Sequence, residues 1–126
     1  MGVPEESVGN VKSGAVDVIY GSATGLTSAV NQHLSQASPG IEGDLSDHSG
    51  FGYRVAVGNF GNSGPADLAI GAPNPTLQGH LPGVVHTIYG SATGLTPTGN
   101  QLWSRDTPGI LGSSTGFFGW SLASSP

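Results

Sequence analysis

The apolar residues of this chain fall in short clusters that Gly and Pro interrupt. Three clusters are rich in β-branched and aromatic residues, at 53–60 (YRVAVGNF), 66–72 (ADLAIGA) and 83–90 (GVVHTIYG), and a weaker one follows at 100–105 (NQLWSR). Short runs of this kind between turn residues are typical of β-strands. No window keeps a helical apolar period without a Gly or Pro, so we expect no long helix. The pattern predicts an all-β protein.

The same pattern occurs twice along the chain. Residues 14–27 (GAVDVIYGSATGLT) recur 69 positions later as residues 83–96 (GVVHTIYGSATGLT), and this register holds without a gap from residue 2 to residue 43. Two residues then drop out of the second copy, after which residues 49–57 match residues 115–124. Agreement over so long a stretch predicts two copies of one structural unit.

Each complete copy is expected to hold four short antiparallel strands, the first two joined as a hairpin by a tight glycine-bearing loop. Four strands per repeated unit predict a β-propeller blade. We therefore expect a partial blade with strands two to four and an inter-blade loop at residues 1–48, a complete blade at residues 49–114, and the first strand of a following blade at residues 115–126. Just under two blades make an incomplete propeller. Because both ends fall inside the repeat pattern, the chain is expected to be trimmed at both ends.

Composition and charge narrow the possible partners. Hydrophobic residues make up 36% of the chain and are clustered, which favours a folded chain over a disordered one despite 22 Gly and 9 Pro. Charged residues make up only 9%, and the formal net charge is −5. The basic residues Lys12, Arg54 and Arg105 are far apart, so we expect neither nucleic acid nor an anionic membrane surface as a partner. No apolar run approaches the ~20 residues of a spanning helix, and membrane insertion is not expected.

A bracketed segment in the second copy suggests a family. Phe51 and Gly52 open it, ADLAIG stands inside it, and Gly71, Ala72 and Pro73 close it. This bracket resembles the FG-GAP repeat, known from integrin α-chain propellers and many bacterial secreted or surface proteins, and IYGSATGL looks like the bacterial members. The resemblance covers nearly the whole chain. It implies propeller blades, a place outside the cell or on its surface, and a non-catalytic binding or adhesion role.

The resemblance also assigns structural roles to the bracket residues. Phe51 and Phe118, which open successive copies, are expected to be core aromatics between neighbouring blades. Gly52, Gly71 and Gly119 are expected to permit a close backbone approach or a bulge.

In that family the loop between the first two strands often runs Asp-x-Asp-x-Asp-Gly-x-x-Asp and binds calcium. Here the loop reads NFGNSGPAD, and the ligand positions fall on Asn59, Gly61, Ser63, Pro65 (through its carbonyl) and Asp67. Only Asp67 brings charge, and calcium affinity rises with the number and charge of the oxygen ligands. We expect a degenerate calcium loop that holds calcium at most weakly, no other cofactor, and polar side chains bonded to the hairpin backbone.

No catalytic pattern emerges, and an enzyme is not expected. Asp44, Asp47 and His48 gather in DLSDHSG, but the second copy has SSTGFFG there, so a solvated loop is expected rather than a zinc or hydrolytic site. Asp17 and His86 are equivalent positions on third strands, and exposed side chains are expected at both. The absence of cysteine excludes disulfides and thiolate ligands.

Three functions fit these features. The first is a binding or adhesion module, part of a larger extracellular FG-GAP propeller whose loops contact a protein or carbohydrate ligand. The second is an accessory propeller of a secreted enzyme whose catalytic domain lies outside this chain. The third is self-association of several copies into one ring, because propellers close over ~4 to 8 blades and fewer than three repeats rarely bury enough surface alone. The further blades would belong to the same parent chain or to associated copies.

Overall fold

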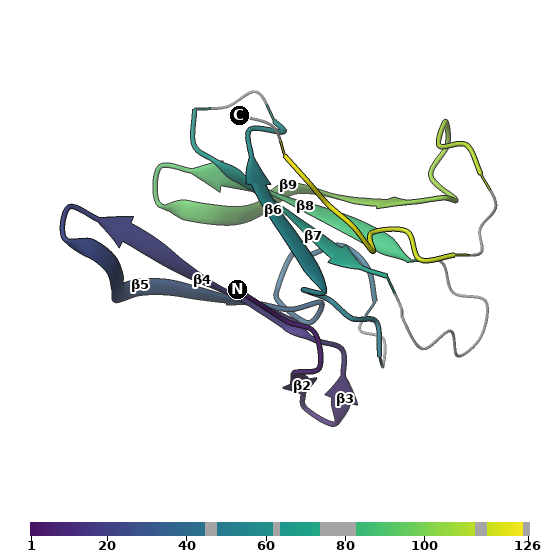
Figure 1. Ribbon diagram of the computed structural model, residues 1–126, viewed down its shortest axis with the longest axis horizontal. Coiled ribbons are helices and arrows are strands. Elements are labelled where there is room, and N and C mark those ends of the chain that lie inside the picture. Colours follow the sequence, from purple (N-terminus) through teal and green to yellow (C-terminus); the bar gives the residue numbers. More distant parts are fainter. Residues whose placement is uncertain (45–47, 62–63, 74–82, 113–115, 125–126) are drawn as a thin grey trace.

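The computed structural model describes residues 1–126 apart from 45–47, 62–63, 74–82, 113–115 and 125–126 (Figure 1). The described residues form nine strands, all paired antiparallel, and contain no helix, so none of their segments is a helix able to cross a membrane. The prediction of an all-β protein is confirmed. The strands are β1 (Gly2–Val3), β2 (Ser7–Val8), β3 (Val11–Lys12), β4 (Ala15–Ser22), β5 (Gly25–Leu34), β6 (Arg54–Gly58), β7 (Asp67–Ala72), β8 (Val84–Ser91) and β9 (Gly94–Ser104).

The second copy, residues 49–114, forms one four-stranded sheet in the order β6-β7-β8-β9. β6 and β7 lie inside their predicted ranges, and β8 ends at Ser91, one residue past its predicted range. β9 begins at Gly94, well before the predicted start at residue 100. The reason is a tight turn after β8. The hydroxyl of Ser91 donates a hydrogen bond to the carbonyl of Gly94 (2.7 Å) and accepts one from the amide of Thr93 (3.3 Å). The chain therefore reverses at once and pairs again.

The first copy, residues 1–48, forms a smaller sheet with the same register. Its strand order is β1-β4-β5, and β2 and β3 pair separately as a short hairpin. Gly2 faces Val16 just as Gly71 faces Val85, and both β4 and β8 carry an irregularity near their Tyr. The hairpin ends of β4–β5 and β8–β9 point toward the same end of the molecule (Figure 1). The sequence repeat is thus a structural repeat, and we call residues 1–48 and 49–114 the first and second repeat.

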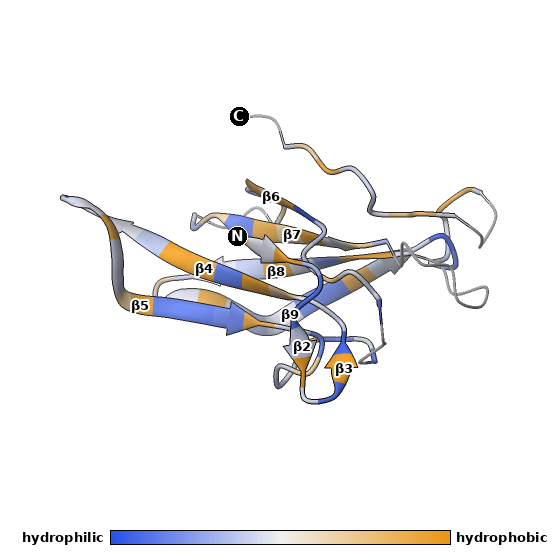
Figure 2. Ribbon diagram, turned by 60° about the horizontal axis from the view of Figure 1, so that its bottom comes forward, coloured by the Kyte–Doolittle hydropathy of each residue, from blue (hydrophilic) through white to orange (hydrophobic). Residues whose placement is uncertain are grey.

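The hydrophobic core lies between the two repeats. In β4 the polar Asp17 stands between the apolar Val16 and Val18, and much of β5 is hydrophilic (Figure 2). As a result β4 turns Val16 and Val18 toward the second repeat, where they meet Ile70 and Ile88. The buried members of this core are Val16, Ile41, Phe51, Leu68, Ile70, Ala72 and Ile88. Phe51 is fully buried at the junction, as expected for its place in the bracket.

We call Phe51-Gly52 and Phe118-Gly119 the Phe-Gly corners. Each corner packs against the copy that precedes it in the chain. A Cβ on Gly2 would overlap the carbonyl of Gly52, and a Cβ on Gly71 would overlap the carbonyl of Gly119, so the expected close approach occurs twice. Residues 116–124 differ from the predicted strand: they form no strand and are held at Val57 of β6, whose carbonyl accepts a hydrogen bond from the hydroxyl of Ser124 (2.6 Å). β6 itself is a strand because β7 of its own repeat pairs with it.

Candidate functional sites

Asp67 organises the loop in which the degenerate calcium site was expected. It is the first residue of β7, and only 1% of it is exposed. One carboxylate oxygen accepts the backbone N–H groups of Phe60 (2.7 Å) and Gly61 (2.8 Å), and the other accepts that of Gly90 (2.8 Å). The carboxylate therefore ties the β6–β7 loop to β8.

These contacts keep the carboxylate charged. Burial by itself raises the pKa of Asp67, but the hydrogen bonds from Gly90, Gly61 and Phe60 outweigh it and hold the pKa below its ordinary value. The negative charge is thus stabilised by backbone donors, and a cation in this loop would have to compete with them.

The remaining loop positions add little charge. Gly61 lies against the ring of Tyr89, so that a Cβ on Gly61 would come within 2.6 Å of two ring carbons. Asn59 and Pro65 flank the loop, and Ser63 lies outside the described residues. Within the described part of the chain, no three His, Asp or Glu side chains gather in a way that could hold a metal ion. A weak calcium site in this loop stays a prediction.

The two equivalent third-strand positions have different environments. The side chain of Asp17 is 44% exposed, and its Oδ1 lies 2.7 Å from Nδ1 of His33. His86 is fully buried, which corrects the expected exposure: β7 and β9 flank it, and the ring of Phe51 packs edge-on against it at 5.0 Å. Among the described residues, neither ring nitrogen has a hydrogen-bond partner, and burial lowers the pKa of His86 to about 4. Asp17 escapes burial because no sheet of the described chain covers that face of β4.

Two polar side chains of the first repeat bind the backbone of the second. The amide of Leu95 donates to the hydroxyl of Tyr20 (2.9 Å) and to Oε1 of Gln32 (3.0 Å), while Nε2 of Gln32 donates to the carbonyl of Leu95 (2.8 Å). The hydroxyl of Tyr20 also donates to Oε1 of Gln32. Residue type alone does not mark these side chains as contact residues. The available signal is that both recur at the repeat offset, as Tyr89 and Gln101.

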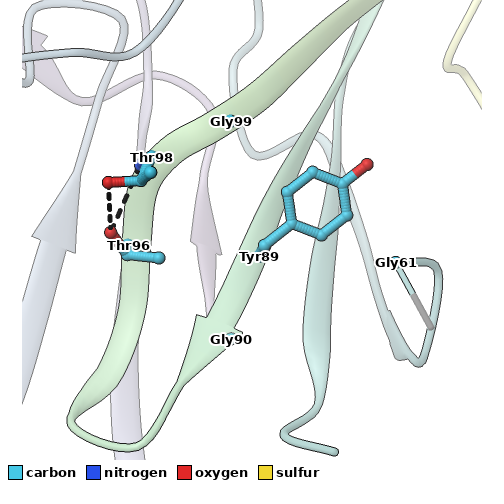
Figure 3. Close-up of a pocket in the computed structure, with 6 residues that line it drawn as sticks. All are labelled: Gly61, Tyr89, Gly90, Thr96, Thr98 and Gly99. Atoms are coloured by element: carbon cyan, nitrogen blue, oxygen red, sulfur yellow. Dashed lines mark hydrogen bonds between the residues drawn. The ribbon is translucent and has the colours of Figure 1, made fainter. Parts of the chain in front are cut away.

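The equivalent pair in the second repeat stands beside an open pocket. The hydroxyl of Tyr89 donates to Oε1 of Gln101 (2.6 Å). The ring of Tyr89 lies between the bend of β9 and the loop at Gly61 (Figure 3). The pocket has a volume of about 340 Å³ and is lined by Gly61, Tyr89, Gly90, Thr96, Thr98 and Gly99.

A cluster of three aromatic rings, two of them exposed and that of Tyr53 half-buried, forms a second surface feature. The rings of Tyr53 and Trp120 lie 4.7 Å apart between centroids, and Phe117 lies 5.0 Å from Trp120. The guanidinium of Arg54 stands 4.8 Å from the centre of the Tyr53 ring. Phe117 and Trp120 are each 41% exposed. We call Tyr53, Arg54, Phe117 and Trp120 the aromatic corner.

Comparison with known proteins identifies no relative. A scan against protein-family models gives no match, and searches of curated proteins and of solved structures give none either. The geometry above must therefore support any proposed function.

Proposed function

We propose that this chain is a non-catalytic binding module of the FG-GAP propeller type, in which the two repeats are adjacent blades. It acts outside the cell or on its surface and belongs to a larger propeller. Two equivalent antiparallel repeats pack together, and the two Phe-Gly corners pack on Gly2 and Gly71. This arrangement supports the assignment. The repeat register and the bracket in the sequence support it as well.

The aromatic corner is the proposed contact surface, and it is the main evidence for a binding role. Exposed Trp and Tyr are the side chains that most often anchor interfaces. They supply apolar ring faces together with polar tips. Of the four residues that define the corner, Arg54 alone is charged, and its guanidinium lies over a ring. A surface of this kind suits a neutral ligand, either a carbohydrate or an uncharged protein surface.

A binding screen tests the proposal. Arrays of neutral glycans and of extracellular proteins identify a ligand, and calorimetry measures its affinity for the Trp120→Ala variant. Loss of the central ring is expected to weaken binding about 30-fold or more, as for a hot-spot aromatic. Phe60→Ala removes a similarly exposed aromatic, 43% exposed, outside the corner and is the matched control. Equal affinity of the Trp120→Ala variant and the unsubstituted chain would contradict the assignment.

A further inference from the structure

The contact between the two repeats has a defined hydrogen-bonding arrangement. Tyr20 and Gln32 hold both backbone groups of Leu95. The preceding Gly94 has a φ of 120° and lies so close that a Cβ there would be 2.8 Å from the Tyr20 hydroxyl and 3.1 Å from Oε1 of Gln32. The β8–β9 hairpin tip thus fits against a Tyr–Gln pair, and glycine at the tip makes the fit possible.

Both halves of this contact occur a second time, and within the described part of the chain neither of these copies contacts the other repeat. Tyr89 and Gln101 form the same side-chain pair beside the pocket of Figure 3. At the other end of the contact, Leu26 is the equivalent of Leu95 and is 78% exposed. Gly25 has a φ of 119°, matching Gly94, and a Cβ there would meet no atom within 4 Å. The β4–β5 tip therefore has the backbone geometry of the bound tip.

The apolar surfaces beside these groups are also equivalent. A Cβ on Gly52 would lie 3.1 Å from Cγ2 of Val16, and a Cβ on Gly119 would lie 3.1 Å from Cγ2 of Val85. The outer face of the second repeat is therefore equivalent to the face of the first repeat that packs against the second repeat. Ile19 is 40% exposed on β4, whereas its equivalent Ile88 is fully buried between the repeats. A further repeat-like surface placed against β4 would bury Ile19 as Ile88 is buried.

We propose that this chain associates head to tail with a second copy of itself. The β4–β5 tip of one copy, Ser22–Leu26, occupies the pocket beside Tyr89 in the other copy. The amide and carbonyl of Leu26 then bond to Tyr89 and Gln101. The contact uses different surfaces on the two copies, so each dimer keeps one free tip and one free pair, and further copies add to a ring or a filament. The proposal goes beyond the ligand-binding role and does not depend on the aromatic corner.

Complementation between two variants tests this arrangement by sedimentation velocity. Tyr89→Phe with Gln101→Ala removes the pair, and Leu26→Pro removes the tip amide, while Leu26→Ala keeps that amide as a control. We expect association of the unsubstituted chain and of Leu26→Ala to rise with concentration. Each defective variant alone is expected to associate about 100-fold more weakly, because two or three hydrogen bonds are lost. An equimolar mixture of the two defective variants is expected to form dimers and nothing larger, since only one productive contact remains.

A second pair of substitutions separates association from folding. Tyr20→Phe with Gln32→Ala is expected to lower the thermal midpoint while leaving association between copies in place. Circular dichroism verifies that each variant folds, and the Tyr89 and Gln101 variant alone suffices if Leu26→Pro does not fold. A monomeric unsubstituted chain at all concentrations would overturn the proposal. Undiminished association of the Tyr89 and Gln101 variant, or a mixture of folded variants that stays monomeric, would overturn it too.

Discussion

At the scale of single residues, Asp67 shows how one buried carboxylate can hold a loop through backbone N–H groups. Three backbone N–H groups from two segments converge on its two oxygens. Backbone donors bonded to a charged acceptor are among the stronger hydrogen bonds in proteins. The loop therefore gains a fixed shape from its own amides.

Asp67→Asn is expected to lower the free energy of unfolding at pH 7 by about 2–4 kcal/mol, because an amide presents an N–H where the carboxylate accepts one. The pKa of Asp67 is lowered in the folded state, so its contribution is present above the ordinary value of 3.8 and is lost as the pH falls below it. Urea unfolding at pH 7 and pH 3 should show the deficit shrinking in acid. The exposed Asp106→Asn is the control, and an equal deficit at both pH values would contradict this account.

His86 gives a pH dependence in a higher range. Burial lowers its pKa to about 4 from 6.5, so between these values the unfolded chain binds a proton that the folded chain does not. The free energy of unfolding is therefore expected to fall as the pH falls from about 6.5 to about 4. His86→Leu should remove this slope, measured by urea unfolding across that range, while the exposed His33→Gln keeps it. If the slope persists in the His86→Leu variant, groups other than His86 cause it.

At the scale of the elements, one sequence segment occurs in both repeats but has different neighbours in each. IYGSATGL occurs in both, yet Gly90 lies under the β6–β7 loop and Gly21 lies in the open. A Cβ on Gly90 would overlap the carbonyl of Ala66, whereas a Cβ on Gly21 would meet nothing within 4 Å. The same glycine is required for packing in one repeat only.

Gly90→Ala is accordingly expected to lower the free energy of unfolding by about 2–3 kcal/mol through overpacking. Gly21→Ala should change it by less than about 1 kcal/mol, because only the entropy of the unfolded chain changes. Thermal and urea unfolding of the two variants provide the comparison. Similar losses in both would show that the β6–β7 loop does not pack on Gly90 as described.

The sequence predicts the strands that local apolar patterns specify. Short apolar runs between Gly and Pro located β6, β7 and β8, and the offset of 69 located β1 and β4, the counterparts of β7 and β8. The early start of β9 was not readable, because a side-chain bond from Ser91 makes its turn. The burial of His86 and the contacts of Tyr20 with Leu95 depend on packing between repeats, and alternation within one strand cannot reveal that.

At the scale of the whole molecule, the two repeats share one core. Val16 of the first repeat packs with Phe51, Ile70 and Ile88 around the junction. Neither repeat can bury these side chains without the other, so we expect the described sheets to unfold together.

Val16→Ala is expected to lower the free energy of unfolding by roughly 1–3 kcal/mol. Hydrogen exchange should show the same decrease for amides of β4 and of β8, because the substitution weakens a common unit. Val30→Ala, at a position 56% exposed, is the control and should change neither strand. Faster exchange confined to β4 would show that the repeats unfold separately.

The stack of Tyr53 on Trp120 has a further use. The two rings belong to successive Phe-Gly corners and lie 4.7 Å apart at an angle of 37°. Aromatic rings this close couple their near-ultraviolet transitions and transfer excitation from tyrosine to tryptophan. Detachment of the last corner from the second repeat would separate these two rings and weaken both effects. The chain thus contains an intrinsic optical reporter of this junction, which can be followed in real time without a label.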